Sequence, residues 1–437
     1  MDEYSSMRTL NQTLAKGQMA SWRKGARRLP DLPPDRPLYY PQIGVYRGKG
    51  ASHSWLWFVD VLERMGFYDL SFPDESCIQE NVLDRMDVLA VSGGDTLGIA
   101  KGLGRAGASK LARFIRGGGL YLGSCAGAYL PLHSSKEHLN LFNFVPVKIA
   151  NLTQTLPEAR GLREKFCTAY GCAYVFHPVR EAVMLQSGGF APFQYARSFA
   201  APLYGGPPMI APDPDMVAAT YAGFTPKTLF LADETIARET LLGRAAVIRA
   251  AFGLGHFHLY GPHCEHPKFP LANTLLAKAL YWDLPSTQAG PRHTDADFKT
   301  VLSGASARSL LRNIRREISN ARIVAAGMET LPIRWRIGEK IYEVGKIRVF
   351  LEAIWARIPN LERSDPIAFT QGLDKQLIER LPLITALVRQ IRRGVDLGTD
   401  TKGLAKDLFA NLNEVSALFL EMYFQTQRRL FGGRHEA

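Results

Sequence analysis

One cysteine of the sequence stands where a nucleophile would be held. Cys125 lies in the stretch GGLYLGSCAGAYLPL (Gly118–Leu132), after an apolar run typical of a strand and before residues that open a helix. The five residues GSCAG around it fit G-x-nucleophile-x-G, a crowded strand–turn–helix corner that needs small residues on both sides. The N–H groups and dipole of the following helix would favour thiolate, the reactive form. The stretch therefore predicts a cysteine nucleophile.

A cysteine that attacks a carbonyl needs N–H donors for the oxyanion that develops. The N–H of Ala126, directly after Cys125, is the first candidate. Gly94, in the stretch VSGGDT at the end of another apolar run, is the second. Gly93 and Gly94 are equally consistent with a tight turn. Asp95 is expected to cap the helix that follows.

A base and its orienting group are predicted in the stretch LYGPHCEHP. His263 and Glu265 stand two residues apart after an apolar run. In extended backbone this spacing puts both side chains on one face, where the carboxylate would orient the imidazole and stabilise its charged form. The alternatives are a small core residue at Cys125 and a hydrogen-bonded pair that ties down a strand end.

In this order, the GGD loop, the G-x-C-x-G corner and the later H-x-E resemble the class I glutamine amidotransferase-like superfamily. The chain is more similar still to the N-terminal domain of the biotin protein ligase type, from about Ile43 to Trp282. The stretches that carry this resemblance are VYRGKGAS (Val45–Ser52), VSGGDTLGIAKGLG (Val91–Gly104), FIRGGGLYLGSCAGAYL (Phe114–Leu130), LYGGPPM (Leu203–Met209) and GPHCEHP (Gly261–Pro267). Two departures stand out: no glycine/arginine-rich adenylate-binding loop of a biotin ligase catalytic half appears, and no synthetase domain to receive ammonia.

The resemblance implies a flavodoxin-like parallel sheet and a Cys-His-Glu triad. Cys125 would be the nucleophile, His263 the base and Glu265 its orienting group, with Gly94 and Ala126 as the oxyanion hole. Candidates for the substrate pocket are Gly93, Tyr129, Tyr204 and Gly205. The last two lie in the stretch YGGPP, for which a plain turn is the alternative.

The elements that must position these residues alternate between strand and helix. Short apolar runs bounded by glycine, such as MDVLAVSGGDT and GLYLGSC, are typical of buried parallel strands. The stretch SKLARFIRGG is typical of an amphipathic helix that glycine ends. Together they predict an α/β fold with a parallel sheet. From Asn140 to about Leu259 strand-like runs dominate and are expected to extend the same domain.

Three regions are predicted along the chain. Residues 1–40 form a basic, flexible arm, residues 41–284 the glutamine amidotransferase-like α/β domain, and residues 285–437 an all-α domain resembling a four-helix bundle. The last region shows apolar stripes at helical spacing, one of them from Ile337 to Ile354. Ser364 and Asp365 before Pro366 predict a helix start. These helices would provide self-association or recruit a protein partner.

Composition narrows the class of protein further. The chain of 437 residues has 46% hydrophobic residues, enough for two or three soluble globular domains. No run approaches the eighteen or so apolar residues of a membrane span, and no secretory signal is seen, so a cytoplasmic location is expected. The net charge of +12 is spread along the chain without a recognition motif, which argues against nucleic-acid binding.

Neither a metal nor a cofactor is expected. The five cysteines form no disulfide framework. Cys167, Cys172 and His177 match no common zinc spacing. The first hypothesis is therefore a cysteine-dependent amidase or amidotransferase-like hydrolase that acts on a small amide or acyl substrate. The alternative is a catalytically silent binding or regulatory module that works through a partner, with a link to biotin ligation resting on the resemblance alone.

Overall fold

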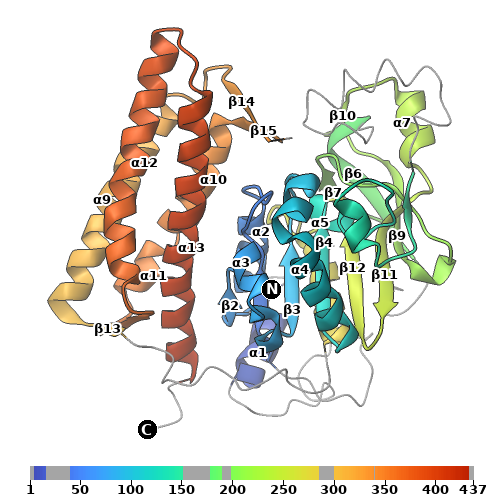
Figure 1. Cartoon of the computed structure of the whole chain (residues 1–437), viewed down its shortest axis with the longest axis horizontal. Helices are drawn as coiled ribbons and strands as arrows, with labels where there is room; N and C mark the ends of the chain where they lie inside the picture. The colour runs from blue at the N-terminus through green and yellow to red at the C-terminus, as the bar shows by residue number, and fades with distance from the viewer. Residues whose placement is uncertain are drawn as a thin grey trace. The chain divides into compact units, whose positions relative to one another are not determined.

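The computed structural model describes residues 4–15, 40–150, 178–188, 198–284, 300–338 and 340–432. The chain divides into two compact units, coloured along the chain in Figure 1. Unit 1 takes in Met1–Phe67, Pro73–Pro291 and Gly338–Lys340, and unit 2 takes in Tyr68–Phe72, Arg292–Ile337 and Ile341–Ala437.

A parallel sheet forms the centre of unit 1. The strands β1, β3, β4 and β12 pair in parallel in that order, and the sheet order continues from β1 to β2, a short strand within the segment Tyr68–Phe72 that is counted with unit 2. Their bounds are β1 Ile43–Val45, β2 Leu70–Ser71, β3 Val88–Val91, β4 Leu120–Ser124 and β12 Gly255–Tyr260. The order β2-β1-β3-β4-β12 is the 2-1-3-4-5 order of flavodoxin-like sheets. The predicted α/β fold with a flavodoxin-like sheet is confirmed.

Antiparallel strands extend this sheet beyond β12, so that the whole sheet is mixed. The order continues from β12 through β11, β9 and β6 to β10, with β7 on β6, β8 on β11 and β5 on β8. The bounds are β5 Lys148–Ile149, β6 Val179–Ser187, β7 Phe199–Leu203, β8 Met209–Ile210, β9 Val217–Phe224, β10 Leu229–Phe230 and β11 Ala245–Phe252. These strands agree with the strand-like runs predicted between Asn140 and Leu259.

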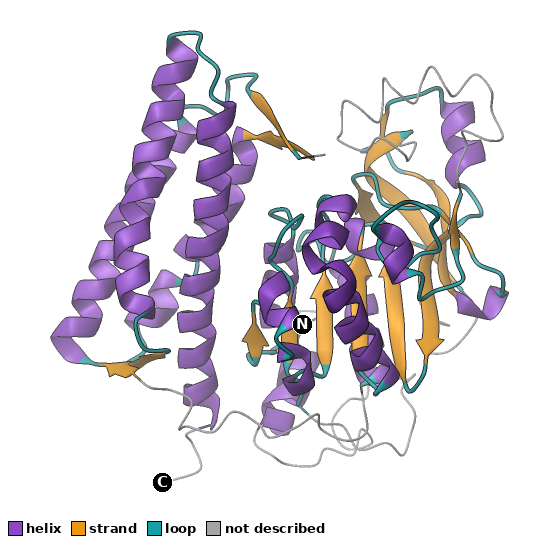
Figure 2. Cartoon of the chain, in the orientation of Figure 1, coloured by secondary structure: helices purple, strands orange, loops and turns teal. Residues whose placement is uncertain are grey.

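Helices cover the parallel sheet on both faces. Phe257 and Leu259 of β12 belong to one apolar core with α4 (Thr96–Arg116) and α5 (Ala126–Tyr129). Successive side chains of a strand point to opposite faces, and His258 Nε2 lies 2.6 Å from Asp283 Oδ2 at the end of α8 (Pro270–Asp283). The helices α4 and α5 therefore cover one face and α8 the other. Figure 2 distinguishes these helices from the strands.

Shorter helical elements complete unit 1. They are α2 Trp55–Arg64, α3 Glu75–Gln79, η2 Val82–Arg85, η3 Leu139–Phe142, η5 Pro214–Met216 and α7 Glu234–Leu241. Asp95 caps α4, since its carboxylate accepts from the Gly98 N–H at 3.0 Å, as predicted.

The region expected to be a flexible arm contains a docked helix instead. The helix α1 spans Ser5–Ala15. Met7, Leu10 and Leu14 are buried at its apolar face, and Asn11 is completely enclosed. Burial of these three apolar side chains offsets part of the entropy cost of ordering the segment. The basic residues of the rest of the arm lie outside the described residues.

Unit 2 is mainly helical. Its long helices are α9 Gly304–Ala326, α10 Val344–Trp355, α12 Leu373–Asp396 and α13 Lys402–Gly432, with the short α11 Ile358–Glu362. Packing runs from α9 to α12, α13 and α10 and back to α9 (Figure 1). Apolar residues such as Ile314, Leu351, Val388 and Val415 are buried between them. A helical region after the α/β fold is confirmed.

Two details of unit 2 differ from the sequence-based expectation. The stripe that begins at Ile337 is helical only from Val344, because β14 (Arg334–Ile337) and β15 (Lys340–Glu343) form a hairpin there. Ser364 and Asp365 do not start a helix: the chain continues into β16 (Ile367–Phe369), which pairs with β13 (Thr300–Leu302). The unit is therefore not purely α. Throughout the described part of the chain, no helix combines the length and apolar character that a membrane crossing requires.

Candidate active site at the ends of β4 and β12

The corner at Cys125 has the geometry that the sequence pattern predicts. Cys125 connects β4 directly to α5 and adopts φ +51° and ψ −107°. Residues other than glycine rarely adopt a positive φ, because this backbone conformation is strained. Backbone strain of this kind concentrates at functional sites. A Cβ at Gly123 would lie 2.5 Å from the Gly127 carbonyl oxygen, and one at Gly127 would lie 2.0 Å from the Val91 carbonyl oxygen. Both glycines of the pattern are therefore required by close backbone contact.

The pairing of β4 with β12 brings the predicted base to this corner. Tyr260 lies opposite Ser124 in the parallel ladder, and the Cys125 N–H donates to the Tyr260 carbonyl oxygen at 2.9 Å. The chain then turns rather than continuing as the expected extended backbone. The His266 N–H donates to the His263 carbonyl oxygen at 3.0 Å, so that a turn brings the side chains of His263 and Glu265 together.

Cys125, His263 and Glu265 form a connected row. The His263 imidazole lies close enough to the Cys125 thiol for its charge and hydrogen bonding to lower the pKa of the thiol. His263 Nδ1 lies 2.7 Å from Glu265 Oε1. The exposed fractions of the three residues are 3%, 3% and 0%. Enclosure from water strengthens each of these electrostatic contacts.

Charge in this row favours an ionised thiol. Burial raises the pKa of the Cys125 thiol, but the charge of His263 and its hydrogen bond outweigh burial and hold that pKa below its ordinary value. Burial lowers the pKa of His263, but Glu265 and Cys125 outweigh it and raise the pKa to about 9. Both shifts favour the charged forms, a thiolate beside an imidazolium. Because α5 has only four residues, the imidazolium replaces the helix dipole expected from the sequence as the main source of thiolate character.

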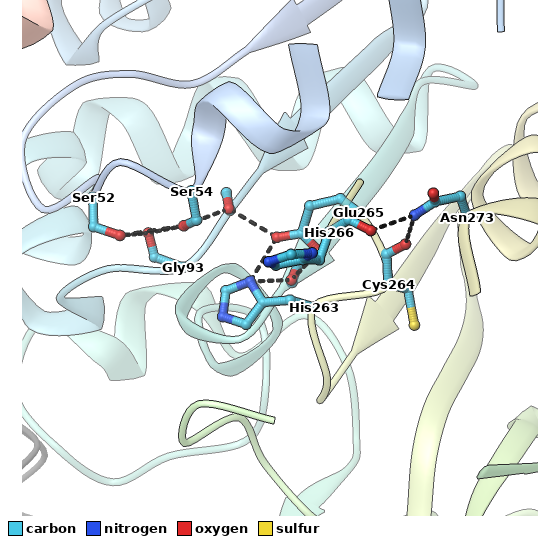
Figure 3. A network of polar contacts seen from close by, with 10 residues as sticks. Ser52, Ser54, Gly93, His263, Cys264, Glu265, His266 and Asn273 are labelled. Carbon is cyan, nitrogen blue, oxygen red and sulfur yellow. Dashed lines mark hydrogen bonds and ion pairs between the residues drawn. The ribbon is translucent and has the colours of Figure 1, made fainter. Parts of the chain in front are cut away.

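Two serines that sequence reasoning missed hold the Glu265 carboxylate. Ser124 Oγ donates to Glu265 Oε2 at 2.7 Å, and Ser92 Oγ donates to Oε1 at 3.0 Å. These serines directly precede Cys125 and Gly93. The hydroxyl chain continues to Ser54 Oγ, 2.8 Å from Ser92 Oγ (Figure 3). Hydrogen bonds to both oxygens fix the plane of the carboxylate and therefore the direction of the imidazole.

The predicted oxyanion-hole residues lie beside the row. A Cβ at Gly93 would lie 2.5 Å from His263 Cε1, so the glycine loop passes against the imidazole. Gly94 pairs with Ala51 in an isolated antiparallel bridge. Ala126 is the first residue of α5, where N–H groups have no acceptor within the helix.

Aromatic side chains pack against the imidazole. The ring centroids of Trp57 and Tyr204 lie 5.2 Å and 5.6 Å from that of His263, and both residues are only partly buried. Tyr204, which the sequence predicted as a pocket residue, thus lies against the imidazole. Tyr129 is buried instead, and its hydroxyl donates to the Gly205 carbonyl oxygen at 3.1 Å. Trp57 was not predicted.

The free cysteine beside the base has a different character. Cys264 is completely buried, and burial raises its pKa well above the ordinary value. Within the described ranges, no group of three or more His, Cys, Asp or Glu side chains is arranged to hold a metal ion. Cys167, Cys172 and His177 lie outside those ranges.

Comparisons with known proteins find distant structural neighbours. The chain is similar to a ThuA-like protein from Bacteroides uniformis (15% identity, TM-score 0.33, 57% of this chain and 94% of that one). It is also similar to β-galactosidases from Bacillus circulans sp. alkalophilus (11%, TM-score 0.32) and Rahnella sp. R3 (9%, TM-score 0.31). Each of these two matches covers 56% of this chain and 31% of the β-galactosidase. No curated protein matches the chain.

A family model matches part of unit 1. The matched segment, residues 41–137, includes β1, β3, β4 and Cys125 but ends before His263 and Glu265. The model is that of the biotin-protein ligase N-terminal region, and residues 41–137 are similar to that family.

Proposed function

We propose that this chain is a cysteine-dependent amidase or amidotransferase-like hydrolase that acts on a carboxamide or related acyl group. The observation that carries the proposal is the row Cys125–His263–Glu265, with the nucleophile at positive φ and the base 2.7 Å from its carboxylate. A strained corner, a depressed thiol pKa and an oriented imidazole are together what thiol acyl transfer requires.

In the proposed reaction the Cys125 thiolate attacks the carbonyl carbon, and the carbonyl electron pair moves to oxygen. The N–H groups of Gly94 and Ala126 would receive this oxyanion. When the oxyanion collapses, the C–N bond breaks and the His263 imidazolium gives its proton to the leaving amine. A thioester on Cys125 remains. Water then attacks it, giving one proton to His263, and the C–S bond breaks to release the carboxylic acid; an amine acceptor would give a new amide instead.

Two measurements test this proposal. Release of ammonia from a panel of primary carboxamides measures turnover, and intact mass with peptide mapping after chloroacetamide treatment locates the reactive thiol. The wild type is expected to release ammonia and to be modified at Cys125, whereas Cys125→Ala is expected to do neither. Cys264→Ala is the matched control, since it removes the neighbouring buried thiol with the raised pKa. Modification at Cys264, or wild-type ammonia release by Cys125→Ala, would contradict the proposal.

A second candidate is a binding module that has the same site but turns nothing over. The observation in its favour is the enclosure of the site, with Cys125 and His263 each 3% exposed. The similarity of residues 41–137 to the biotin-protein ligase N-terminal region is compatible with a role through a partner. Modification of Cys125 without ammonia release from any carboxamide of the panel would favour this module.

A further inference from the structure

A side chain outside the triad fixes the loop that carries the base. Asn273 of α8 is completely buried. Its Nδ2 donates to the Cys264 carbonyl oxygen at 2.6 Å and to the His266 carbonyl oxygen at 3.1 Å. These two carbonyls stand on either side of Glu265 in the sequence (Figure 3). A single amide group therefore holds the turn from which both His263 and Glu265 project.

The orientation of this amide is fixed in turn by α1. The Tyr4 hydroxyl, directly before α1, donates to Asn273 Oδ1 at 2.7 Å. A flipped amide would aim Oδ1 at two carbonyl oxygens and take the Asn273 donor away from both, although the His266 carbonyl oxygen would still accept from the Phe269 N–H at 3.1 Å. With the Tyr4 hydroxyl on Oδ1, both Nδ2 hydrogens point at the loop. Tyr4 is itself 6% exposed, so that water has little access to this chain of hydrogen bonds.

A second buried hydroxyl anchors α1 at Asn11 rather than at Asn273. The Tyr281 hydroxyl donates to Asn11 Oδ1 at 2.9 Å, and Asn11 Nδ2 donates to the Met65 carbonyl oxygen at 2.7 Å. Tyr4 and Tyr281 thus each contribute one buried hydroxyl to the docking of α1. The hydrogen bond of the Tyr4 hydroxyl leads through Asn273 to the loop of the base, whereas that of the Tyr281 hydroxyl leads through Asn11 to the Met65 carbonyl oxygen.

We propose that Asn273 is a positioning residue for the His263–Glu265 pair and that Tyr4, through Asn273, makes the docked helix α1 part of the active-site support. Part of residues 1–40, which the sequence predicted to be a basic arm, would thereby help to position the His263–Glu265 pair. The proposal deepens the proposed function and rests on it for the identity of the reacting thiol. It also predicts that the two anchors of α1 differ: loss of the Tyr4 hydroxyl should affect the active site, whereas loss of the Tyr281 hydroxyl should affect stability alone. If α1 only stabilised the fold, the two losses would have the same effect.

The test compares Tyr4→Phe with Tyr281→Phe in the full chain. Each variant removes one buried hydroxyl and keeps its ring. Iodoacetamide alkylation of Cys125 is followed by peptide mapping as a function of pH, and Tm is measured in parallel. Tyr4→Phe is expected to move the alkylation midpoint to higher pH and to reduce the rate at neutral pH by about threefold to tenfold. Both variants are expected to lower Tm by similar amounts, because each loses one buried hydrogen bond. Tyr281→Phe is expected to leave the alkylation midpoint at its wild-type pH.

Two outcomes would overturn the inference: equal displacement of the midpoint by both variants, or displacement by neither. Asn273→Ala is expected to give a larger displacement than Tyr4→Phe, and if it does not fold, the tyrosine pair still decides. An NMR titration of the His263 ring makes the same comparison without alkylation, with Tyr4→Phe expected to lower its pKa from about 9. Absence of ammonia release from every carboxamide would defeat the proposed function alone, because the titration of His263 needs no turnover.

Discussion

Glutamine at position 265 would remove the charge that supports the base while keeping the shape of the side chain. The amide oxygen can still accept from His263 Nδ1. The amide nitrogen would take the place of Oε2, which lies 2.7 Å from Ser124 Oγ in the wild type. It can donate a hydrogen bond to that hydroxyl, because a hydroxyl accepts as well as donates. We therefore expect Glu265→Gln to fold and to change mainly the electrostatics of the row.

The size of the effect follows from the shift of His263. Its pKa of about 9, against an ordinary 6.5, represents about 3 kcal/mol in favour of the imidazolium. Burial opposes this shift, and Glu265 is the largest of the interactions that produce it. Without the carboxylate we expect the pKa of His263 to fall by at least about one unit. The charge of Glu265 by itself raises the pKa of Cys125, but this interaction is smaller than that of the His263 charge, which is the main one that lowers it. The pKa of Cys125 should therefore rise as His263 loses its proton.

The assay is alkylation of Cys125 by iodoacetamide across the pH range, with intact mass and peptide mapping as the readout. In Glu265→Gln the midpoint should move to higher pH and the rate at neutral pH should fall by about tenfold or more. Glu239→Gln, which removes the same charge from an exposed position of unit 1, is the control. An unchanged midpoint in Glu265→Gln would refute the electrostatic reasoning.

Two further predictions concern the neighbourhood of the row and the stability of unit 1. In Gly93→Ala the new Cβ would lie 2.5 Å from His263 Cε1, so the imidazole would have to move. This displacement should slow Cys125 alkylation by about a hundredfold with little change in Tm. A wild-type alkylation rate would show that the position of the imidazole does not depend on this contact. Asp283 is buried, which by itself raises its pKa, but Arg249 and His258 hold that pKa below its ordinary value. Its stabilisation is therefore present above the ordinary carboxyl pKa and lost as pH falls through the lowered one. Asp283→Asn should cost about 3–5 kcal/mol at neutral pH and flatten the acid dependence of urea unfolding; an acid dependence equal to that of the wild type would contradict this.

The sequence was most informative where a local pattern reports a local constraint. Glycines on both sides of Cys125 predicted the corner because backbone contacts there exclude a Cβ. Alternating strands and helices predicted the parallel sheet, because buried strands and amphipathic helices differ in period. His263 and Glu265 were predicted as a pair, although through an extended backbone that the structure replaces with a turn.

Contacts between distant segments escaped prediction. Ser92 and Ser124 reach Glu265 only because the ends of β3, β4 and β12 meet at one edge of the sheet, and a single serine carries no periodic signal. The docking of α1 depends on Tyr4 meeting Asn273, 269 residues away. In unit 2 the apolar stripe at Ile337 continued a helical period by coincidence, and a hairpin occupies the residues before Val344.

The pairing of β4 with β12 also determines when the thiol can become reactive. Cys125 and Ser124 are synthesised well before the strand that lies beside them, and the sheet cannot place His263 until β12 has entered between β4 and β11. At about 5–20 residues per second, the ribosome makes the intervening chain over on the order of ten seconds. During that interval the cysteine has neither its imidazole nor its carboxylate, and it behaves as an ordinary thiol. Under the proposed function, a nascent or partly unfolded chain therefore lacks an activated nucleophile, and thiol reactivity reports completion of the domain.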